Sequence, residues 1–520
     1  MRFKQEAVLG KNQIRLRFSG FVVFTTQFLG IITGLIFTLF LTRSMTVSQF
    51  GIWTNIFDYT PYFIILSGVL PFWATRFTAR RKEGTAKTAA LSQLSIAVVS
   101  TIIYLPVIFL VSYAIGTSAY LMIYFIAGLY ILNSYLVAVF EAVLQATKPQ
   151  STGYGFIIQE IVKVTVALIV ILVFKQIFLG AILALVLALS VQVLYYCCLL
   201  SDYFKEKVNW SFLRQWLKGS PAIAFNAIGA LLVSFVFILL FIYGGSESRA
   251  YYQAALSFTT IIGYASSLAV ALYPKLLANS CTDEEVGLSF RTVMMLAIPL
   301  ATITMSMGVS FLTVLNVSYG VAWPVLIALS VDTLVVLLNT FYSSCLMGVE
   351  SFDAEGQISL RKLVRSKIFK VFSIPYIQAA VALPLTYFVL TQLPVAGSVA
   401  ATVEVVGILI SVHAATFVGL YFLMRHSIHV PVAWTKLGKY VFAALLMGTT
   451  LLFIPTTTTL LSTIAKAIVG FALYTGLLLA LDSQARGLMR LIWKEIAETL
   501  KQLVHRPIDA GENNTFASEN

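Results

Sequence analysis

Several ionisable side chains lie inside long apolar stretches of this 520-residue sequence. A charged side chain at the centre of a bilayer costs about 2.5 to 3.5 kcal/mol on insertion scales, so each is a candidate functional group. Carboxylates in such positions can bind a proton or Na⁺, and an ammonium group can meet an anionic ligand. The candidates for ion coupling are Asp58, Glu160, Asp332 and Glu404, and the candidates for ligand binding include Asp58 and Lys163.

Glu160 and Lys163 are three residues apart, which places them on one face of a helix. They could neutralise each other as a structural pair that holds helices together. Alternatively, Lys163 could bind an anionic head group, because it is the cation that lies well inside an apolar stretch.

Asp58 has polar neighbours in Asn55 and Tyr59, so its apolar stretch has an unusually polar middle and should face the protein interior. Asp58 could bind a cation or a sugar, or it could form a hydrogen bond between helices. Asp332 and Glu404 could likewise bind an ion or serve only as polar packing groups.

The elements that carry these residues must be membrane-spanning helices. Hydrophobic residues make up 59% of the chain, charged residues make up 11%, and the mean hydropathy is +0.89, which excludes a water-soluble globular domain. Because a helix needs about 20 apolar residues to cross a bilayer, we expect an all-α polytopic protein with about fourteen spans. The expected spans are Phe18 to Leu41, Phe50 to Trp73, Leu94 to Ile115, Tyr120 to Leu144, Tyr154 to Phe174, Ile177 to Leu200, Ala222 to Tyr243, Tyr251 to Leu277, Thr292 to Val314, Ala322 to Met347, Phe369 to Leu390, Ala400 to Leu423, Leu437 to Ile454 and Leu460 to Leu481.

Positive charge is distributed in a way that predicts the orientation of these spans. Of the 35 Lys and Arg residues, all fall in the N-terminus, the even-numbered gaps or the C-terminus except Arg43, Lys163, Lys175, Arg249 and Lys466. Under the positive-inside rule, this pattern indicates a multi-pass protein of the cell membrane with both termini in the cytoplasm. The net charge of +13 therefore reflects topology, and we expect no nucleic-acid partner.

The spans divide into two similar halves. Phe50 to Trp73 and Tyr251 to Pro274 both run from aromatic residues towards a proline or tryptophan followed by a basic residue, at an offset of about two hundred residues. This predicts a parallel repeat, with a lobe of helices 1–6 at 1–204, a lobe of helices 7–12 at 205–424, and helices 13–14 at 425–482. Residues 483–520 should form an amphipathic cytoplasmic segment, Arg486 to Leu503, and a disordered tail.

No catalytic or cofactor signature is present in the sequence. It lacks a Walker loop, a zinc signature and a nucleophile elbow, so we expect neither an enzyme nor a bound cofactor or metal. The four cysteines, Cys197, Cys198, Cys281 and Cys345, do not indicate a disulfide framework.

The architecture and two stretches resemble a known family. Fourteen spans as six plus six plus two, the stretch Leu41 to Trp53, and the stretch Tyr251 to Pro274 resemble polysaccharide-transport flippases of the multidrug/oligosaccharidyl-lipid/polysaccharide exporter superfamily. The resemblance implies an alternating-access carrier that moves a polyprenyl-linked or dolichyl-linked oligosaccharide from the cytoplasmic to the outer leaflet. Membrane lipids, H⁺ or Na⁺, and enzymes of glycan assembly are then the expected partners.

The resemblance also implies where ligand would bind. It places spans one, two, seven and eight around a central cavity, which makes Gln27, Asp58, Asn226 and Tyr252 candidate wall residues. Arg17, Arg76 and Lys275 lie at the inner ends of spans one, two and eight, where they could be lipid anchors or a basic entrance for a phosphate-linked head. The first two spans contain few deep cations, which argues against a diphosphate clamp at mid-depth.

Two other functions stay open at this level. One is a cation-coupled multidrug or metabolite antiporter of the same superfamily, in which Asp58 or Glu404 would bind the coupling ion. The other is a membrane glycosyltransferase or ligase, which the very short outer gaps disfavour because such enzymes usually carry catalytic groups on large outer loops.

Overall fold

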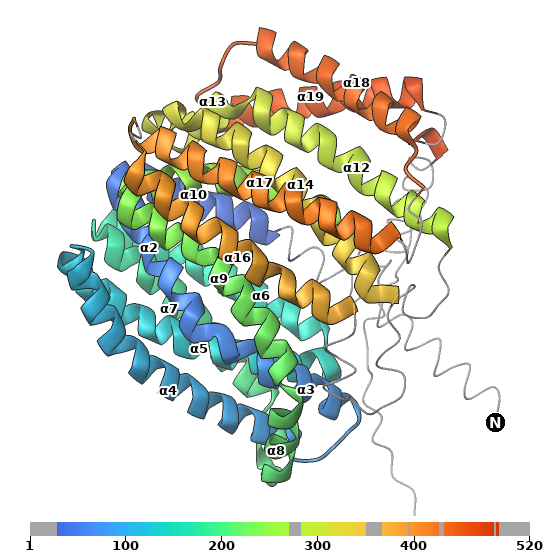
Figure 1. Cartoon of the computed structure of the whole chain (residues 1–520). Coiled ribbons are helices and arrows are strands. Elements are labelled where there is room, and N and C mark those ends of the chain that lie inside the picture. Colours follow the sequence, from blue (N-terminus) through green and yellow to red (C-terminus); the bar gives the residue numbers. More distant parts are fainter. Residues whose placement is uncertain are drawn as a thin grey trace, which may run out of the picture.

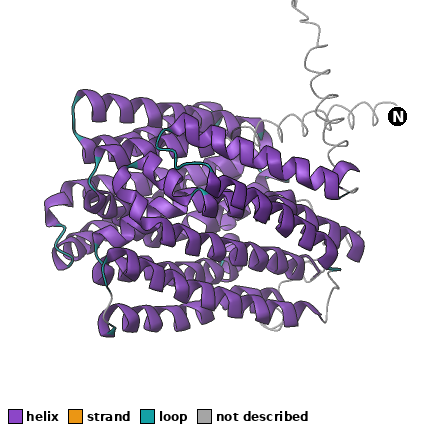
Figure 2. Cartoon of the chain, turned by 90° about the horizontal axis from the view of Figure 1, so that it is seen from above, coloured by secondary structure: helices purple, strands orange, loops and turns teal. Residues whose placement is uncertain are grey.

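The computed structural model describes residues 26, 29–269, 282–349, 367–393, 396–425, 431–482 and 485–487. Within these ranges every regular element is a helix (Figure 2). Twelve of the described helical segments are long and apolar enough to cross a membrane. The expected first and eighth spans are not among them, and both continue into residues outside the described ranges. The predicted all-α, polytopic membrane fold is confirmed.

A first bundle contains the helices up to residue 199 (Figure 1), of which α2 also packs against α9 and α10 of the second bundle. Its central element, α5, contacts α3, α4, α6 and α7. The elements are the helix Leu29–Ser44, α2 (Val47–Ile64), η1 (Ile65–Gly68), α3 (Val69–Ala79), α4 (Thr85–Ala114), η2 (Ser118–Tyr120), α5 (Leu121–Thr147), α6 (Gln150–Leu168), the π turn η3 (Ile169–Val173) and α7 (Ile177–Leu199).

A second bundle is built around α10 and α14. It contains α9 (Pro221–Gly244), α10 (Ser246–Gly263), η5 (Tyr264–Ala269), α12 (Asp283–Ser306), α13 (Gly308–Leu315), η6 (Val317–Ala322), α14 (Trp323–Val349), α16 (Lys367–Gln392) and α17 (Ser398–Arg425). The last pair, α18 (Trp434–Phe453) and α19 (Leu460–Leu481), packs on α12 at one edge of the molecule (Figure 1). The division of the whole chain into lobes at residues 204, 424 and 482 stays a prediction.

The two ends of the bundles differ in charge. One end, here called the basic end, carries the α3–α4 connection with Arg80, Arg81 and Lys82. The other, here called the opposite end, carries the α4–α5, α9–α10 and α16–α17 connections.

Local sequence explains where key helices begin and bend. Thr46 accepts a hydrogen bond from the backbone of Gln49, whose side chain accepts one from the backbone of Thr46, and this capping box starts α2 at the opposite end. Pro61 lies inside α2, and after Ile64 the helix narrows to the 3₁₀ turn η1. The segment η5 follows α10 in the same way, at the predicted offset of about two hundred residues.

One short helix is absent from the expected spans. Trp210–Gly219 forms α8 between the two bundles, with Asn209 accepting a hydrogen bond from the backbone of Ser211 at its start. Trp216 is fully buried and its ring lies 5.6 Å from that of Phe77 on α3. The basic segment between spans six and seven is thus partly a surface helix anchored on the first bundle.

Candidate transport site

The two bundles meet most closely where α2 of the first packs against α10 of the second. A Cβ atom added at Gly51 would lie 1.8 Å from the backbone oxygen of Ser246, so only glycine permits this approach. The Oγ atoms of Ser48 and Ser246 are hydrogen-bonded at 2.7 Å. The seam between α2 and α10 is therefore closed at the opposite end.

Further bonds between the bundles lie near the same end. The Arg43 guanidinium donates to the backbone oxygen of Val314 at 2.9 Å, and the Asn316 amide donates to the backbone oxygen of Thr42 at 3.3 Å. Arg43, one of the few basic residues on this side in the sequence, thus fastens the first bundle to the end of α13.

The hydrophobic cores also connect the two bundles at one end only. One core includes residues of both bundles, such as Phe50 and Tyr124 from the first and Tyr252 and Leu326 from the second. Towards the basic end the cores are separate, one around Trp216 in the first bundle and one around Phe290 and Tyr342 in the second. The bundles therefore share apolar packing near the opposite end and have their own packing near the basic end.

An ion pair lies across the seam. The Arg249 guanidinium on α10 donates from Nε to Asp58 Oδ2 and from Nη2 to Asp58 Oδ1, both at 2.7 Å. The side chains of Arg249 and Asp58 are 6% and 7% exposed, so this bidentate pair is almost fully removed from solvent. Arg249 lies near the start of α10, and its guanidinium reaches Asp58 in the middle of span two.

The remaining surroundings of Arg249 are polar and aromatic. Its Nη1 donates to Gln253 Oε1 at 3.1 Å, and the guanidinium lies 5.3 Å from the Phe237 ring centre and 5.5 Å from that of Tyr252. Both ring distances are within the range of cation–π attraction. A planar guanidinium suits this setting, because it combines a fork of donors with faces that stack on rings.

A polar stripe runs along α10 from this pair towards the basic end. Gln253, Ser257, Thr260 and Tyr264 follow Arg249 at intervals of three or four residues, so they share its helical face. Gln253 and Ser257 are partly exposed, whereas Thr260 and Tyr264 are exposed. Exposure on this face therefore increases with distance from the ion pair.

Span two also becomes more exposed towards the basic end. Pro61, Gly68, Phe72 and Arg76 follow Asp58 at helical spacing, with the 3₁₀ turn between them, and all four are exposed. The Arg76 guanidinium lies over the Phe72 ring at 4.2 Å. From the matching gradients on α10 and span two, we infer a cleft between the bundles that is open at the basic end and ends at Asp58 and Arg249.

The sequence-based ligand candidates are distributed unevenly over this cleft. Asp58 and Tyr252 lie at its closed end, and Arg76 lies near its mouth. Asn226 is exposed near the basic end of α9. Arg17, Gln27 and Lys275 lie outside the described residues.

Glu160 and Lys163 form a pair within the first bundle. Lys163 Nζ lies 2.6 Å from Glu160 Oε2, and the two side chains are 10% and 7% exposed. Glu160 also accepts a hydrogen bond from Thr33 on the helix Leu29–Ser44, and the Lys163 ammonium lies 5.7 Å from the Phe37 ring centre. The pair joins α6 to the first helix.

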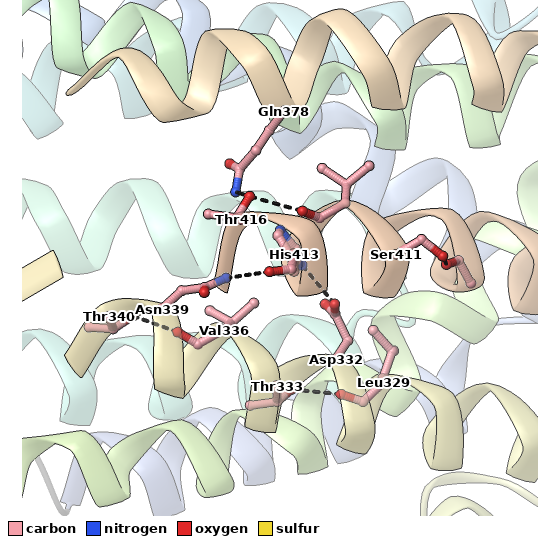
Figure 3. Close-up of polar contacts among 12 residues, drawn as sticks. Leu329, Asp332, Thr333, Val336, Asn339, Thr340, Gln378, Ser411, His413 and Thr416 are labelled. Atoms are coloured by element: carbon pink, nitrogen blue, oxygen red, sulfur yellow. Dashed lines mark hydrogen bonds and ion pairs between the residues drawn. The ribbon is translucent and has the colours of Figure 1, made fainter. Parts of the chain in front are cut away.

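Asp332 and Glu404, the candidates of the second bundle, have different settings. Asp332 Oδ1 on α14 is 2.7 Å from His413 Nδ1 on α17, and both side chains are mostly buried (Figure 3). Glu404 on α17 is exposed. The two carboxylates therefore do not form one site.

Two residues of these clusters were missed at the sequence level. The sequence pattern places Arg249 in a short outer gap and does not single out His413. A signal existed for Arg249, because Arg249, Gln253, Ser257 and Thr260 form a polar face on an otherwise apolar helix. For His413 the signal is its position inside an expected span, because an ionisable residue there is a candidate functional group, as an intramembrane carboxylate is.

Comparison with solved structures identifies the fold. An inward-facing multidrug resistance MATE family transporter of the MOP superfamily superposes with a TM-score of 0.61 at 13% identity, covering 76% of this chain and 94% of its own. The lipid II flippase MurJ, in an inward closed conformation, superposes with a TM-score of 0.62 at 12% identity, covering 88% and 98%.

This chain shares the fold of MOP-superfamily transporters. A MATE protein in the straight conformation also matches, with a TM-score of 0.51 at 14% identity over 79% of this chain and 95% of its own. No protein-family model and no curated protein sequence matches. Identities this low establish a shared fold, and the function must be argued from the residues.

Proposed function

We propose that this protein is a flippase that moves a polyprenyl-linked or dolichyl-linked oligosaccharide from the cytoplasmic to the outer leaflet of the cell membrane by alternating access. The basic end is then cytoplasmic, as are both termini, in agreement with the positive-inside rule. The described conformation corresponds to a cleft open to the cytoplasm and closed towards the outside. The product would supply glycan-assembly enzymes on the outer surface.

The observation that carries this proposal is Arg249 at the closed end of the inferred cleft. Its guanidinium is held by Asp58 and Gln253 and lies near two rings, where water is largely excluded. A guanidinium fork is well matched to phosphate oxygens. A lipid phosphate or diphosphate that entered the cleft could therefore replace Asp58 as the partner of Arg249.

The rest of the cleft suits a sugar. Ser257 and Thr260 on α10 and Tyr264 at the start of η5 present hydroxyl groups, and the oxygens of Ser257 and Thr260, which donate their own protons to backbone oxygens of the preceding turn, can accept hydrogen bonds. Phe72 and Tyr264 are exposed large rings that can pack on the apolar face of a sugar. Arg76 at the mouth is positioned to attract the anionic head from the inner leaflet.

The membrane potential favours this direction of transport. An anionic head that moves outward against an inside-negative potential gains about 2.3 kcal/mol per charge per 100 mV. MurJ, whose fold this chain shares, is described as a flippase for the lipid-linked molecule lipid II. Asp58, Asp332 and Glu160 remain candidates for coupling to H⁺ or Na⁺, with Glu404 as the exposed alternative.

The test is translocation in proteoliposomes that contain a fluorescent polyprenyl diphosphate oligosaccharide. We expect the head group to reach the opposite leaflet, and Arg249→Lys to lower the initial rate at least tenfold because lysine keeps the charge and loses the fork. Arg80→Lys, an exposed change at the basic end, is the matched control and should keep the rate.

Two results would overturn the proposal. One is purified, correctly inserted protein that leaves the labelled lipid in its original leaflet and accumulates soluble organic cations, which would identify a multidrug antiporter. The other is transfer of the oligosaccharide from the lipid to an acceptor, which would identify a glycosyltransferase or ligase.

A further inference from the structure

Asp332 and His413 form a second buried polar cluster, separate from the cleft, in the core of the second bundle. His413 Nδ1 on α17 and Asp332 Oδ1 on α14 are 2.7 Å apart, with 14% and 9% of the side chains exposed. Asp332 is ten residues into the 27-residue α14, and His413 is sixteen residues into the 28-residue α17, so both lie near the middle of their helices.

Neighbouring side chains join the helices close to His413. The Asn339 amide donates to the backbone oxygen of His413 at 2.9 Å, and the Gln378 amide on α16 donates to the Thr416 hydroxyl at 2.9 Å (Figure 3). Asn339 Oδ1 is buried without a hydrogen-bond partner. Three helices, α14, α16 and α17, are thus joined around the histidine.

The charge of the pair depends on one proton. With a neutral imidazole the pair carries one negative charge in a poorly hydrated position, and with an imidazolium it is neutral overall. Histidine is the residue type whose charge ordinarily changes near neutral pH, which makes this pair a candidate proton-binding site. His413 Nδ1 is within hydrogen-bond distance of Asp332 Oδ1 in the described structure.

Other ionisable groups on the surrounding helices do not replace this partner. Arg249 on α10 is already matched by Asp58, and Glu404 lies nine residues from His413 on the same helix, about 13 Å along its axis. The tyrosines and Cys345 are uncharged near neutral pH. The full set on the packed elements is Glu247, Arg249, Tyr251 and Tyr252 on α10, Tyr243 on α9, Tyr264 on η5, Asp283, Glu284, Glu285 and Arg291 on α12, Tyr319 on η6, Tyr342 and Cys345 on α14, Lys367, Lys370, Tyr376 and Tyr387 on α16, and Glu404, Tyr421 and Arg425 on α17.

A short path connects the pair to the seam. The helices α14 and α17, which carry Asp332 and His413, both pack against α10. In addition, Thr402 on α17 donates to the backbone oxygen of Ser248 on α10 at 3.1 Å. Both helices of the pair therefore contact the helix that closes the seam.

We propose that His413 and Asp332 form a proton-binding site that controls closure of the seam between α2 and α10 at the opposite end. One proton moves from water to the His413 imidazole, and no covalent bond is otherwise formed or broken. Protonation makes the buried pair neutral and stabilises the closed state, whereas its loss leaves an unmatched negative charge that favours opening. A proton then shifts the conformational equilibrium by its difference in affinity for the two states.

This assignment deepens the proposed function, on which it rests for the identity of the coupled transport. It names H⁺ as the coupling ion and His413 as its acceptor. The seam can nevertheless be measured without any lipid-linked substrate, so the two proposals can fail separately.

The first experiment measures the seam directly in lipid nanodiscs. Spin labels at Ser118→Cys and Gln392→Cys, which are exposed at the opposite end of the two bundles, report the distance between them in a background with the native cysteines replaced by serine. We expect the ratio of the short-distance to the long-distance population to rise at least threefold from pH 8 to pH 6. His413→Gln and Asp332→Asn should each remove this pH response.

The matched control replaces the three other histidines, His426, His429 and His505, with glutamine and should keep the response. A response that persists in His413→Gln would overturn the proposal, as would a response that disappears in the control while His413 is intact. A seam that does not respond to pH in the unaltered chain would overturn it as well.

A second measurement observes His413 itself, so it does not require a His413 variant to fold. In the chain with His413 as its single histidine, nitrogen-labelled imidazole gives an NMR signal that reports its protonation. We expect one titration between pH 5 and 9 whose midpoint falls by at least one pH unit on Asp332→Asn, because the carboxylate stabilises the imidazolium. An imidazole that does not titrate in this range, or a midpoint unaffected by Asp332→Asn, would exclude a proton site at this pair.

Discussion

Asp58 and Arg249 lie 191 positions apart in the chain and are joined by two hydrogen bonds of 2.7 Å. Asp58 belongs to the first bundle and Arg249 to the second. The sequence predicts Asp58 as a buried functional group, whereas it places Arg249 in an outer gap. Both charges are buried, and each is costly without the other.

The pair predicts a strong coupling in stability. Asp58→Asn leaves the Arg249 charge buried without its partner and should lower the free energy of unfolding by about 3 to 5 kcal/mol. The double variant Asp58→Asn with Arg249→Gln should recover a large part of this loss. Denaturant unfolding in detergent micelles measures both. Asp202→Asn breaks the fully exposed pair with Lys205 and is the control expected to unfold like the unaltered protein; additive losses in the double variant would contradict a direct coupling.

Close packing at Gly51 predicts that a single methyl group opens the seam. Gly51→Ala would place a Cβ 1.8 Å from the Ser246 backbone oxygen, so α2 and α10 must separate at the opposite end. We expect a cysteine at Ser48 to react at least three times faster with a membrane-impermeant thiol reagent. Gly34→Ala, where nothing lies within 4 Å of the added carbon, should leave the rate unchanged. Equal rates in the two variants would show that the seam is not held by this contact.

The polar stripe on α10 predicts access from the basic end. Single cysteines at Thr260 and Tyr264 should react with an impermeant reagent added at that end at least ten times faster than a cysteine at Ala254, which is fully buried on the same helix. The native cysteines are replaced by serine for this experiment. Similar rates at Thr260 and Ala254 would mean that the exposed face is covered by lipid and that no water-filled cleft follows it.

The pair Glu160 and Lys163 is expected to be structural. Removing one member should cost about 3 to 5 kcal/mol of stability, because the other stays buried and charged. Replacing both, as in Glu160→Leu with Lys163→Met, should restore most of the stability and keep at least half of the flipping rate in proteoliposomes. A well-folded double variant without transport would instead show that the pair acts in transport, through Lys163 at the anionic head group or Glu160 in ion coupling.

The sequence predicted the class of fold well, because the bilayer imposes simple requirements on composition and span length. Twelve of the expected spans are matched by helices, and the boundaries of spans seven and fourteen agree closely with α9 and α19. Apolar length cannot reveal internal breaks, so the separation of span nine into α12 and α13 at Met307 was not foreseen. The surface helix α8 was also missed, because it is too short and amphipathic to resemble a span.

Only some residues of the candidate site could be predicted from the sequence. Rarity of charge inside apolar stretches was enough to select Asp58, Glu160, Lys163 and Asp332, and helical spacing was enough to pair Glu160 with Lys163. Spacing carries no information about contacts between distant helices, so the partners of Asp58 and Asp332, namely Arg249 and His413, depend on how the bundles pack. By itself, the sequence determined a many-helix membrane protein with one basic side, because hydrophobic length and charge are local properties. Only the tertiary structure decided which end of the seam is closed, because that depends on the fit of α2 against α10 at Gly51 and on one buried ion pair.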